Sequence, residues 1–256
     1  MVDHSPRRII IGDVHGHLQG LQTLFSLLAL EDSDRVYFLG DLIDRGPESA
    51  QVIEFVRVNQ YPCLLGNHEQ MMRFAFNTSG LGTDHFAMEA WLSAGGRSTL
   101  DSYTDLSQLD IDLRWIATLP TYLDLGDLWL VHAGVHPLLP LTAQTAQEFC
   151  WIRREFHQTK EPYFADKLIV TGHTITFTFP GVEPGQIVQG AGWLDIDTGA
   201  YHPKSGWLTA LDFTQQQVFQ VNVYSAETRV RPLSEAITSL HPPLHSKSNY
   251  QQAQFF

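Results

Sequence analysis

The sequence predicts an α/β protein built around a largely parallel sheet. Short apolar runs typical of buried strands cover residues 7–11, 35–39 and 62–65, and segments with apolar residues at helical spacing separate them. Strand–helix–strand units normally join parallel strands through right-handed crossovers. The carboxyl ends of these strands should therefore meet at one edge of the sheet, which is where such sheets bind ligands.

Two helices are expected between these three strands. Apolar residues recur at helical spacing from Leu18 to Leu28, and a second apolar face runs from Val52 to Val56. Pro47 suits the first turn of this second helix, because proline lacks an N–H that would be unpaired there.

From about residue 70 to 119 the pattern becomes mostly helical, and we interpret this region as an insertion. Gly95 is a plausible stop for its clearest helix. Trp91 and Trp115 are assigned to the core of the insertion rather than to a substrate platform.

Later segments extend the same pattern. Strands are expected at 127–134 and 167–173 and a helix at 145–157, and residues 206–213 and 217–224 should form an antiparallel pair. The tail from about 232 to 256 is polar and weakly patterned, and we expect it to pack along the surface or to be loose. Because no internal repeat or linker is found, we expect a single domain over residues 1–256.

Composition narrows the classes of partner. The 256 residues carry a net charge of −12, with 16 basic and 28 acidic residues, which argues against general binding to nucleic acid or anionic membranes. Cys63 and Cys150 do not have zinc-ligand spacing and are expected to be reduced core thiols. No segment predicts a signal peptide or a membrane span, so a cytoplasmic location is expected.

Five polar, glycine-flanked segments follow predicted strands: GDVHG (12–16), GDLIDRG (40–46), GNHE (66–69), HAG (132–134) and GH (172–173). Turn and helix-cap chemistry explains any one of them, but five at once would be a coincidence. If the strand ends meet, these segments bring together carboxylates, an amide and imidazoles, enough donors for two metal ions with one bridging carboxylate. The residues concerned are Asp13, His15, Asp41, Asp44, Asn67, His68, His132 and His173.

This ordered set resembles the signature of the phosphoprotein phosphatase (PPP-type) family of calcineurin-like dinuclear metallophosphoesterases, and especially its bacterial branch. The resemblance runs from Gly12 to His173, and DIDTGA, GWLTAL and WLSAGGRSTLDSY also look like segments of bacterial members. It implies a sandwich of two mixed β-sheets flanked by helices, with a helical insertion.

The resemblance also implies two divalent metal ions that share one ligand. One ion would be held by Asp13, His15 and Asp41, and the other by Asp41, Asn67, His132 and His173. Nitrogen and oxygen donors without thiolate suit manganese, iron or zinc. The resemblance favours manganese, because members of this family often work with it.

The expected reaction is direct hydrolysis by a metal-bridging hydroxide. His68 would protonate the leaving oxygen and Asp44 would orient His68. Arg45 offers a planar fork for the phosphate oxygens. By resemblance Arg153 is the second phosphate ligand, although Arg154 is adjacent.

The expected activity is phosphomonoester hydrolysis, with phosphoserine or phosphothreonine in proteins as the leading substrate class. The alternative is hydrolysis of dinucleoside polyphosphates such as diadenosine tetraphosphate, and the partner would then be a phosphorylated small molecule. A deep pocket with basic residues in the insertion would favour a nucleotide as the substrate. An open, shallow groove would favour a phosphopeptide. A third hypothesis is a metal-binding scaffold without activity, but loss of His68, Asp44 or a ligand would mark it, and all are present.

Overall fold

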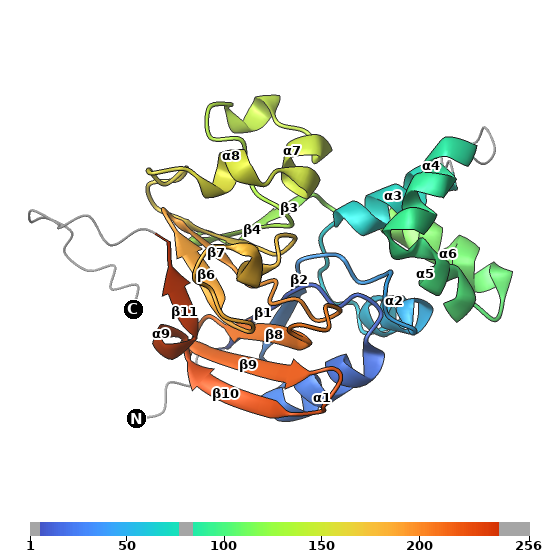
Figure 1. Ribbon diagram of the computed structural model, residues 1–256, viewed down its shortest axis with the longest axis horizontal. Coiled ribbons are helices and arrows are strands. Elements are labelled where there is room, and N and C mark those ends of the chain that lie inside the picture. Colours follow the sequence, from blue (N-terminus) through green and yellow to red (C-terminus); the bar gives the residue numbers. More distant parts are fainter. Residues whose placement is uncertain (1–5, 77–83, 241–256) are drawn as a thin grey trace, which may run out of the picture.

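A computed structural model describes residues 6–76 and 84–240 of the chain. Two β-sheets form the centre and helices surround them (Figure 1). The first sheet has the spatial order β10 (Thr228–Pro232), β9 (Gln217–Asn222), β8 (Trp207–Asp212), β1 (Arg8–Ile11) and β2 (Arg35–Phe38). The second has the order β11 (Ile237–Ser239), β6 (Ile187–Gly190), β7 (Trp193–Asp195), β5 (Leu168–Thr171), β4 (Leu128–Val131) and β3 (Tyr122–Asp124).

Both sheets are mixed, which confirms the sandwich implied by the resemblance and corrects the simpler expectation of one parallel sheet. β1 runs parallel to β2 but antiparallel to β8, and β4, β5 and β7 run parallel to one another. Side chains alternate as a strand requires. Ile10 joins the same apolar cluster as Leu130 of the second sheet, whereas Ile9 and Ile11 belong to the cluster that includes Leu21 of a flanking helix.

Helices cover the outer faces of the sandwich and form a separate lobe. α1 (Leu18–Leu28) packs on β8 and β9 of the first sheet. The lobe, coloured cyan to green in Figure 1, is the predicted insertion. Its helices are α3 (Asn67–Ala75), α4 (His85–Trp91), α5 (Arg97–Ser102) and α6 (Leu106–Ile116), and α2 (Ser49–Val58) packs against it.

The expected third strand at 62–65 is wrong. Only one bridge forms there, between Phe38 and Cys63. Pro62 has no N–H to donate, and the N–H of Leu65 bonds to the carbonyl of Pro120 instead of a strand partner. Cys63 and Cys150 are buried free thiols, as predicted.

One helix expectation is confirmed and another needs correction. Gly95 has a non-helical φ of 118° and kinks the chain between the helix that begins with α4 and the helix α5, so it ends the first of these as predicted. Residues 145–157 form two helices rather than one, α7 (Ala146–Trp151) and α8 (Arg154–His157), because Arg153 between them has non-helical angles.

The predicted tail is ordered in its first part. α9 (Leu233–Ala236) leads into β11, which pairs parallel with β6 at the edge of the second sheet. The rest of the predicted tail, 241–256, lies outside the described residues. Among the described helices, none is long and apolar enough to cross a bilayer.

Candidate active site

The loops that follow β1, β2, β4 and β5 meet the start of α3 between the two sheets. All eight predicted residues from these segments are buried, each at most 5% exposed. The first sheet contributes Asp13, His15, Asp41 and Asp44, α3 contributes Asn67 and His68, and the second sheet contributes His132 and His173.

Backbone strain is concentrated here. Nine residues other than glycine have positive φ in the described part of the chain, and five of them are predicted site residues: His15, Asp41, Asp44, Arg45 and His173. Such conformations cost energy and persist where the surrounding structure enforces them. The motif glycines allow the close approach, since a Cβ on Gly172 would lie 2.1 Å from Oδ1 of Asp13 and one on Gly66 would lie 2.2 Å from Oδ1 of Asp41.

Glu69 fixes the loop that carries Asp41. Its carboxylate accepts the N–H of Gly66 at 3.0 Å, which stabilises the start of α3. It also accepts the N–H groups of Asp41 and Leu42, at 2.9 and 2.8 Å. Glu69 therefore links the GNHE motif to the GDLIDRG motif through hydrogen bonds, a role that sequence reasoning missed.

Two groups of metal-ligand atoms share Asp41. Ligand atoms of His15, Asp41 and His68 lie within 4.8 Å of one another, and so do those of Asp41, His132 and His173. Nε2 of His15 is 3.7 Å and Nε2 of His132 is 3.4 Å from the carboxylate of Asp41. The shared carboxylate is the arrangement that a bridged pair of metal ions requires.

Hydrogen bonds to the far ring nitrogens leave lone pairs directed at this centre. Nδ1 of His15 and Nδ1 of His132 each lie 2.8 Å from a backbone carbonyl, so these nitrogens carry the protons. Nε2 of His173 faces the carbonyl of Trp151 at 3.3 Å in the same way. Burial lowers the pKa of all three imidazoles, which favours their neutral form.

The atoms of Asn67, His132 and His173 that face one another therefore all carry lone pairs, and no hydrogen lies between them. Oδ1 of Asn67 lies 3.0 Å from Nε2 of His132 and 2.8 Å from Nδ1 of His173. Lone pairs at these distances repel one another unless a cation lies among them, and far-side hydrogen bonds of this kind are typical of metal-binding histidines. The residues present thus fit a divalent metal centre.

Asp13, the other carboxylate predicted as a ligand, lies next to His173. It accepts the N–H of His173 at 3.1 Å, which ties the first sheet to the second. Burial, followed by the charges of Asp197 and Asp41, raises the pKa of Asp13 well above its usual range. A bound cation would remove much of this cost.

His68 lies beside the metal-ligand atoms and is paired with Asp44. Its Nδ1 is 2.5 Å from Oδ2 of Asp44, and its Nε2 is 3.9 Å from Oδ2 of Asp41. Asp44 is fully buried and is also bonded by Trp91 and Thr99 of the insertion. Trp91 is a core residue, as predicted, but its contact with Asp44 was missed. The only sequence signal for it was the likeness of WLSAGGRSTLDSY to bacterial relatives.

A cavity of about 200 Å³ opens beside these groups and carries two guanidiniums. Arg45 lies over the ring of Tyr201 at 3.8 Å, and Arg153 donates to the carbonyl of His173 at 3.0 Å. Arg154 instead bonds Gln158 at the surface. The lining residues are Asp41, Arg45, Asn67, His68, Arg153, His173, Ile175, Thr178 and Tyr201. Tyr201 is a lining residue that sequence reasoning missed.

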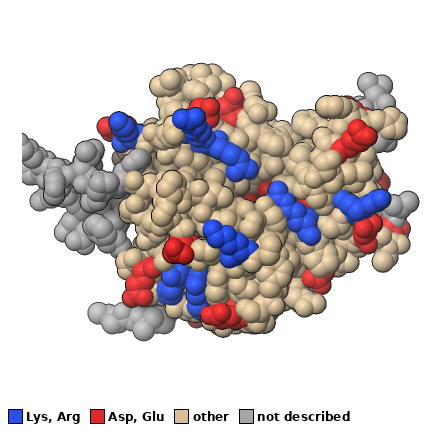
Figure 2. Space-filling model, in the orientation of Figure 1, with Lys and Arg blue, Asp and Glu red and all other residues tan. Residues whose placement is uncertain are grey.

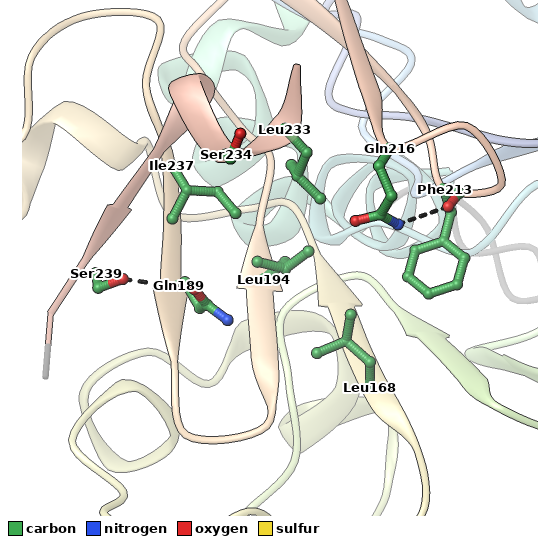
Figure 3. Close-up of a pocket in the computed structure, with 9 residues that line it drawn as sticks. All are labelled: Leu168, Gln189, Leu194, Phe213, Gln216, Leu233, Ser234, Ile237 and Ser239. Carbon is green, nitrogen blue, oxygen red and sulfur yellow. Dashed lines mark hydrogen bonds between the residues drawn. The ribbon is translucent and has the colours of Figure 1, made fainter. Parts of the chain in front are cut away.

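A second cavity has a different character. It lies between α9 and a face of the second sheet, and Leu168, Leu194, Leu233, Ile237 and Phe213 give it apolar walls (Figure 3). None of the predicted site residues lines it. The convergence of charge and metal-ligand atoms thus belongs to the first cavity.

The surface gives no single-sign patch on the side shown in Figure 2, where acidic and basic side chains are interspersed. The positive side chains that line the first cavity are Arg45 and Arg153.

Fold and site together define a metallophosphoesterase. The family model described as "Calcineurin-like phosphoesterase" matches residues 6–177, and the chain belongs to this family. Membership implies divalent metal ions, in agreement with the donor set.

Similar proteins carry two kinds of name. Serine/threonine-protein phosphatase 2 of Escherichia coli (strain K12) is 38% identical over 112 residues, which are 43% of this chain and 48% of the relative. Bis(5'-nucleosyl)-tetraphosphatase PrpE [asymmetrical] of Anoxybacillus flavithermus is 29% identical, covering 83% of this chain and 92% of the relative. The chain thus spans about half the length of the first relative and most of the second. A solved metallophosphoesterase from Sphaerobacter thermophilus shares the fold, with a TM-score of 0.54, 19% identity and coverage of 90% and 91%.

Proposed function

We propose that this chain hydrolyses phosphate esters with the help of two divalent metal ions. The observation that carries the proposal is the arrangement around one cavity of two metal-ligand groups sharing Asp41, two guanidiniums and the His68–Asp44 pair. One ion would be held by Asp13, His15 and Asp41, and the other by Asp41, Asn67, His132 and His173. When bound, these ions activate water and polarise the phosphoryl group.

The protein's own residues would bind the phosphate and protonate the leaving group. Arg45 can turn its N–H groups toward phosphate, because its other contacts are the Tyr201 ring and Nε2 of His15, neither of them a carboxylate. Arg153, held by its bond to the backbone of His173, supplies the second positive charge. Both arginines line the cavity, so a phosphate dianion there would be bound from two sides.

His68 acts as the general acid in this proposal. The short bond to Asp44 fixes its Nδ1 as the protonated nitrogen and leaves Nε2 facing the cavity. His68 also belongs to one of the metal-ligand groups, but its bond to Asp44 through Nδ1 leaves Nε2 as the nitrogen that can donate to the leaving oxygen.

Manganese is the metal we favour. Carboxylate, amide and imidazole donors without thiolate suit it, and iron or zinc would fit the same donor set. Metal analysis of protein purified without added metal, followed by reloading of the chelated protein with each ion, tests this choice.

Phosphoserine or phosphothreonine in a protein is the leading substrate class. The segment similar to the Escherichia coli serine/threonine-protein phosphatase supports it, as does the small cavity, which suits one phosphoryl group on a side chain. Hydrolysis of dinucleoside polyphosphates is the second candidate. The specific observation in its favour is that the PrpE relative matches this chain over 92% of its own length.

A direct comparison of substrates tests the proposal. Manganese-loaded protein is assayed on a phosphothreonine peptide and on diadenosine tetraphosphate, with His68→Asn as the reference variant. We expect a higher kcat/KM on the peptide and a loss of about 10²–10⁴-fold in His68→Asn, as removal of a general acid predicts. A higher kcat/KM on the dinucleotide would select the second candidate. No turnover of either substrate by metal-loaded protein would favour the silent scaffold.

A further inference from the structure

Asp44 receives an unusual number of hydrogen bonds from the helical insertion. Its carboxylate has no exposed surface, so its charge must be satisfied within the protein. Nε1–H of Trp91 donates to both oxygens, at 2.9 and 3.1 Å, and the hydroxyl of Thr99 donates to Oδ1 at 2.6 Å. Only the remaining contact, to Nδ1 of His68, comes from the motif loops.

Thr99 and Ser49 also fix the backbone of Asp44. Its N–H donates to the hydroxyl of Thr99 at 2.9 Å and to that of Ser49 at 3.0 Å. Asp44 has a φ of 72°, a conformation that a residue other than glycine keeps only when its surroundings enforce it. The insertion thus fixes both the carboxylate and the main chain of Asp44.

The kink at Gly95 and Gly96 places Trp91 and the backbone of Arg45. A Cβ on Gly96 would lie 2.5 Å from the indole ring, so only glycine lets Trp91 pack there. The carbonyl of Gly95 accepts the N–H of Arg45 at 3.2 Å, and a Cβ on Gly95 would lie 2.8 Å from Cγ of Arg45. The kink at Gly95 therefore contacts the residue next to Asp44 as well.

We propose that Trp91 and Thr99 are positioning residues that hold Asp44 so that His68 can protonate the leaving oxygen. This inference rests on the proposed function, since it needs His68 to be the general acid. A carboxylate bonded only by His68 could rotate about its side-chain bonds, and the imidazole would follow it. Because Trp91 and Thr99 also donate hydrogen bonds to this carboxylate, they fix the orientation of its plane. The imidazole bonded to it is then fixed as well, and so is the direction in which Nε2 of His68 points.

The inference predicts a selective defect rather than a general one. A leaving alkoxide such as that of phosphoserine needs a proton, whereas p-nitrophenolate is a stable anion and leaves without one. Misplacing the acid should therefore slow phosphoserine hydrolysis and leave p-nitrophenyl phosphate hydrolysis nearly unchanged. A variant with a merely distorted site would lose activity on both substrates.

The experiment uses the full, manganese-loaded chain with Trp91→Phe and Thr99→Val, each of which removes a donor to Asp44. We expect kcat on a phosphoserine peptide to fall about 10-fold, with KM changed less than about 2-fold, and kcat on p-nitrophenyl phosphate to fall less than about 2-fold. Thr99→Ser should restore the rate, because it restores the hydroxyl. Trp115→Phe in the same lobe is the matched control, since its indole is not bonded to any site residue among those described.

His68→Asn separates failure of this inference from failure of the proposed function. Added to His68→Asn, Trp91→Phe should lower the phosphoserine rate no further, because both act on the same proton transfer. Equal loss on both substrates in His68→Asn would overturn the acid assignment and this inference with it. A selective loss in His68→Asn without one in Trp91→Phe and Thr99→Val would overturn this inference alone. If Trp91→Phe fails to fold, Thr99→Val and Thr99→Ser decide the matter.

Discussion

Individual side chains beneath the site are held neutral by burial, and His157 is the clearest case. It is 5% exposed, its ring packs against Phe179 and Trp193, and its Nε2 lies 3.5 Å from Oδ2 of Asp195 without a hydrogen bond. Burial, reinforced by the charge of Arg153, lowers the pKa of His157 to about 4. The folded protein thus binds a proton here less readily than the unfolded chain, whose histidine titrates at about 6.5.

This difference predicts loss of stability in acid. Because the folded pKa is depressed, the contribution of His157 is complete above pH 6.5 and is lost as the pH falls through 4. His157→Phe should keep about 2–3 kcal/mol of unfolding free energy at pH 4 that the wild type loses. Urea unfolding between pH 4 and 7.5 in chelator measures it, with His85→Phe at the exposed end of the insertion as control. Parallel pH curves for the wild type and His157→Phe would refute the prediction.

At the scale of elements, the loops after β1 and β5 must touch for the proposed metal ligands Asp13 and His173 to meet. A Cβ on Gly172 would lie 2.1 Å from Oδ1 of Asp13 and only 3.2 Å from Cγ of the same residue, so the whole carboxyl group would have to move. Gly172 has no positive φ, so the obstacle is contact with the ligand rather than backbone strain.

Gly172→Ala should therefore weaken metal binding more than folding. Moving Asp13 should lower metal affinity about 10–100-fold, as loss of supporting contacts does in other metal sites. Calorimetric titration of chelated protein with manganese measures the affinity. Gly126→Ala is the control: its φ of 93° makes it strained, yet nothing lies within 4 Å of its Cβ, so metal affinity should stay unchanged. Wild-type affinity in Gly172→Ala would show that the contact is not needed.

The elements that the sequence predicts well are those with a local signal. β1 and β4 are continuous apolar runs because they are buried within a two-sheet core, and each is followed directly by a motif loop. Pairing depends on distant partners, which is why 62–65 was wrongly expected to be a strand although Pro120 takes one of its hydrogen bonds. The two-sheet arrangement came from the resemblance, since periodicity alone suggested one parallel sheet.

The candidate site divides in the same way. The motif residues could be predicted because they lie in glycine-flanked motifs, four of which follow strands while the fifth, GNHE, begins α3. Trp91 and Tyr201 could not be predicted, because no motif spacing identifies them. Trp91 contacts Asp44, which is 47 positions away in the sequence, and Tyr201 contacts Arg45, which is 156 positions away. The helix stop at Gly95 could be predicted, because a glycine with positive φ is typical of a helix end. Its contact with Arg45 could not, because the two residues are 50 positions apart.

For the molecule as a whole, the proposed metal centre would also join the two sheets. Asp41 belongs to a loop of the first sheet, and His132 and His173 belong to loops of the second. In the unfolded chain these three ligands are separated by up to 132 residues and do not form a site. Metal should therefore bind the folded chain far more tightly and stabilise the whole molecule.

Metal loading should raise the melting temperature and chelation should lower it. At a free concentration of 100 times Kd, one bound ion contributes about 2.7 kcal/mol, which for a chain of this size corresponds to about 5–10 °C. Differential scanning fluorimetry with manganese or with chelator measures the shift. Asp13→Asn should reduce it, whereas Asp110→Asn, which removes an exposed ion pair with Arg114, should leave it unchanged. If the wild type melts at the same temperature in both conditions, the ligands do not join the sheets through a metal. If Asp13→Asn retains the full shift, Asp13 is not one of the ligands, and the metal set must be drawn from the groups that share Asp41.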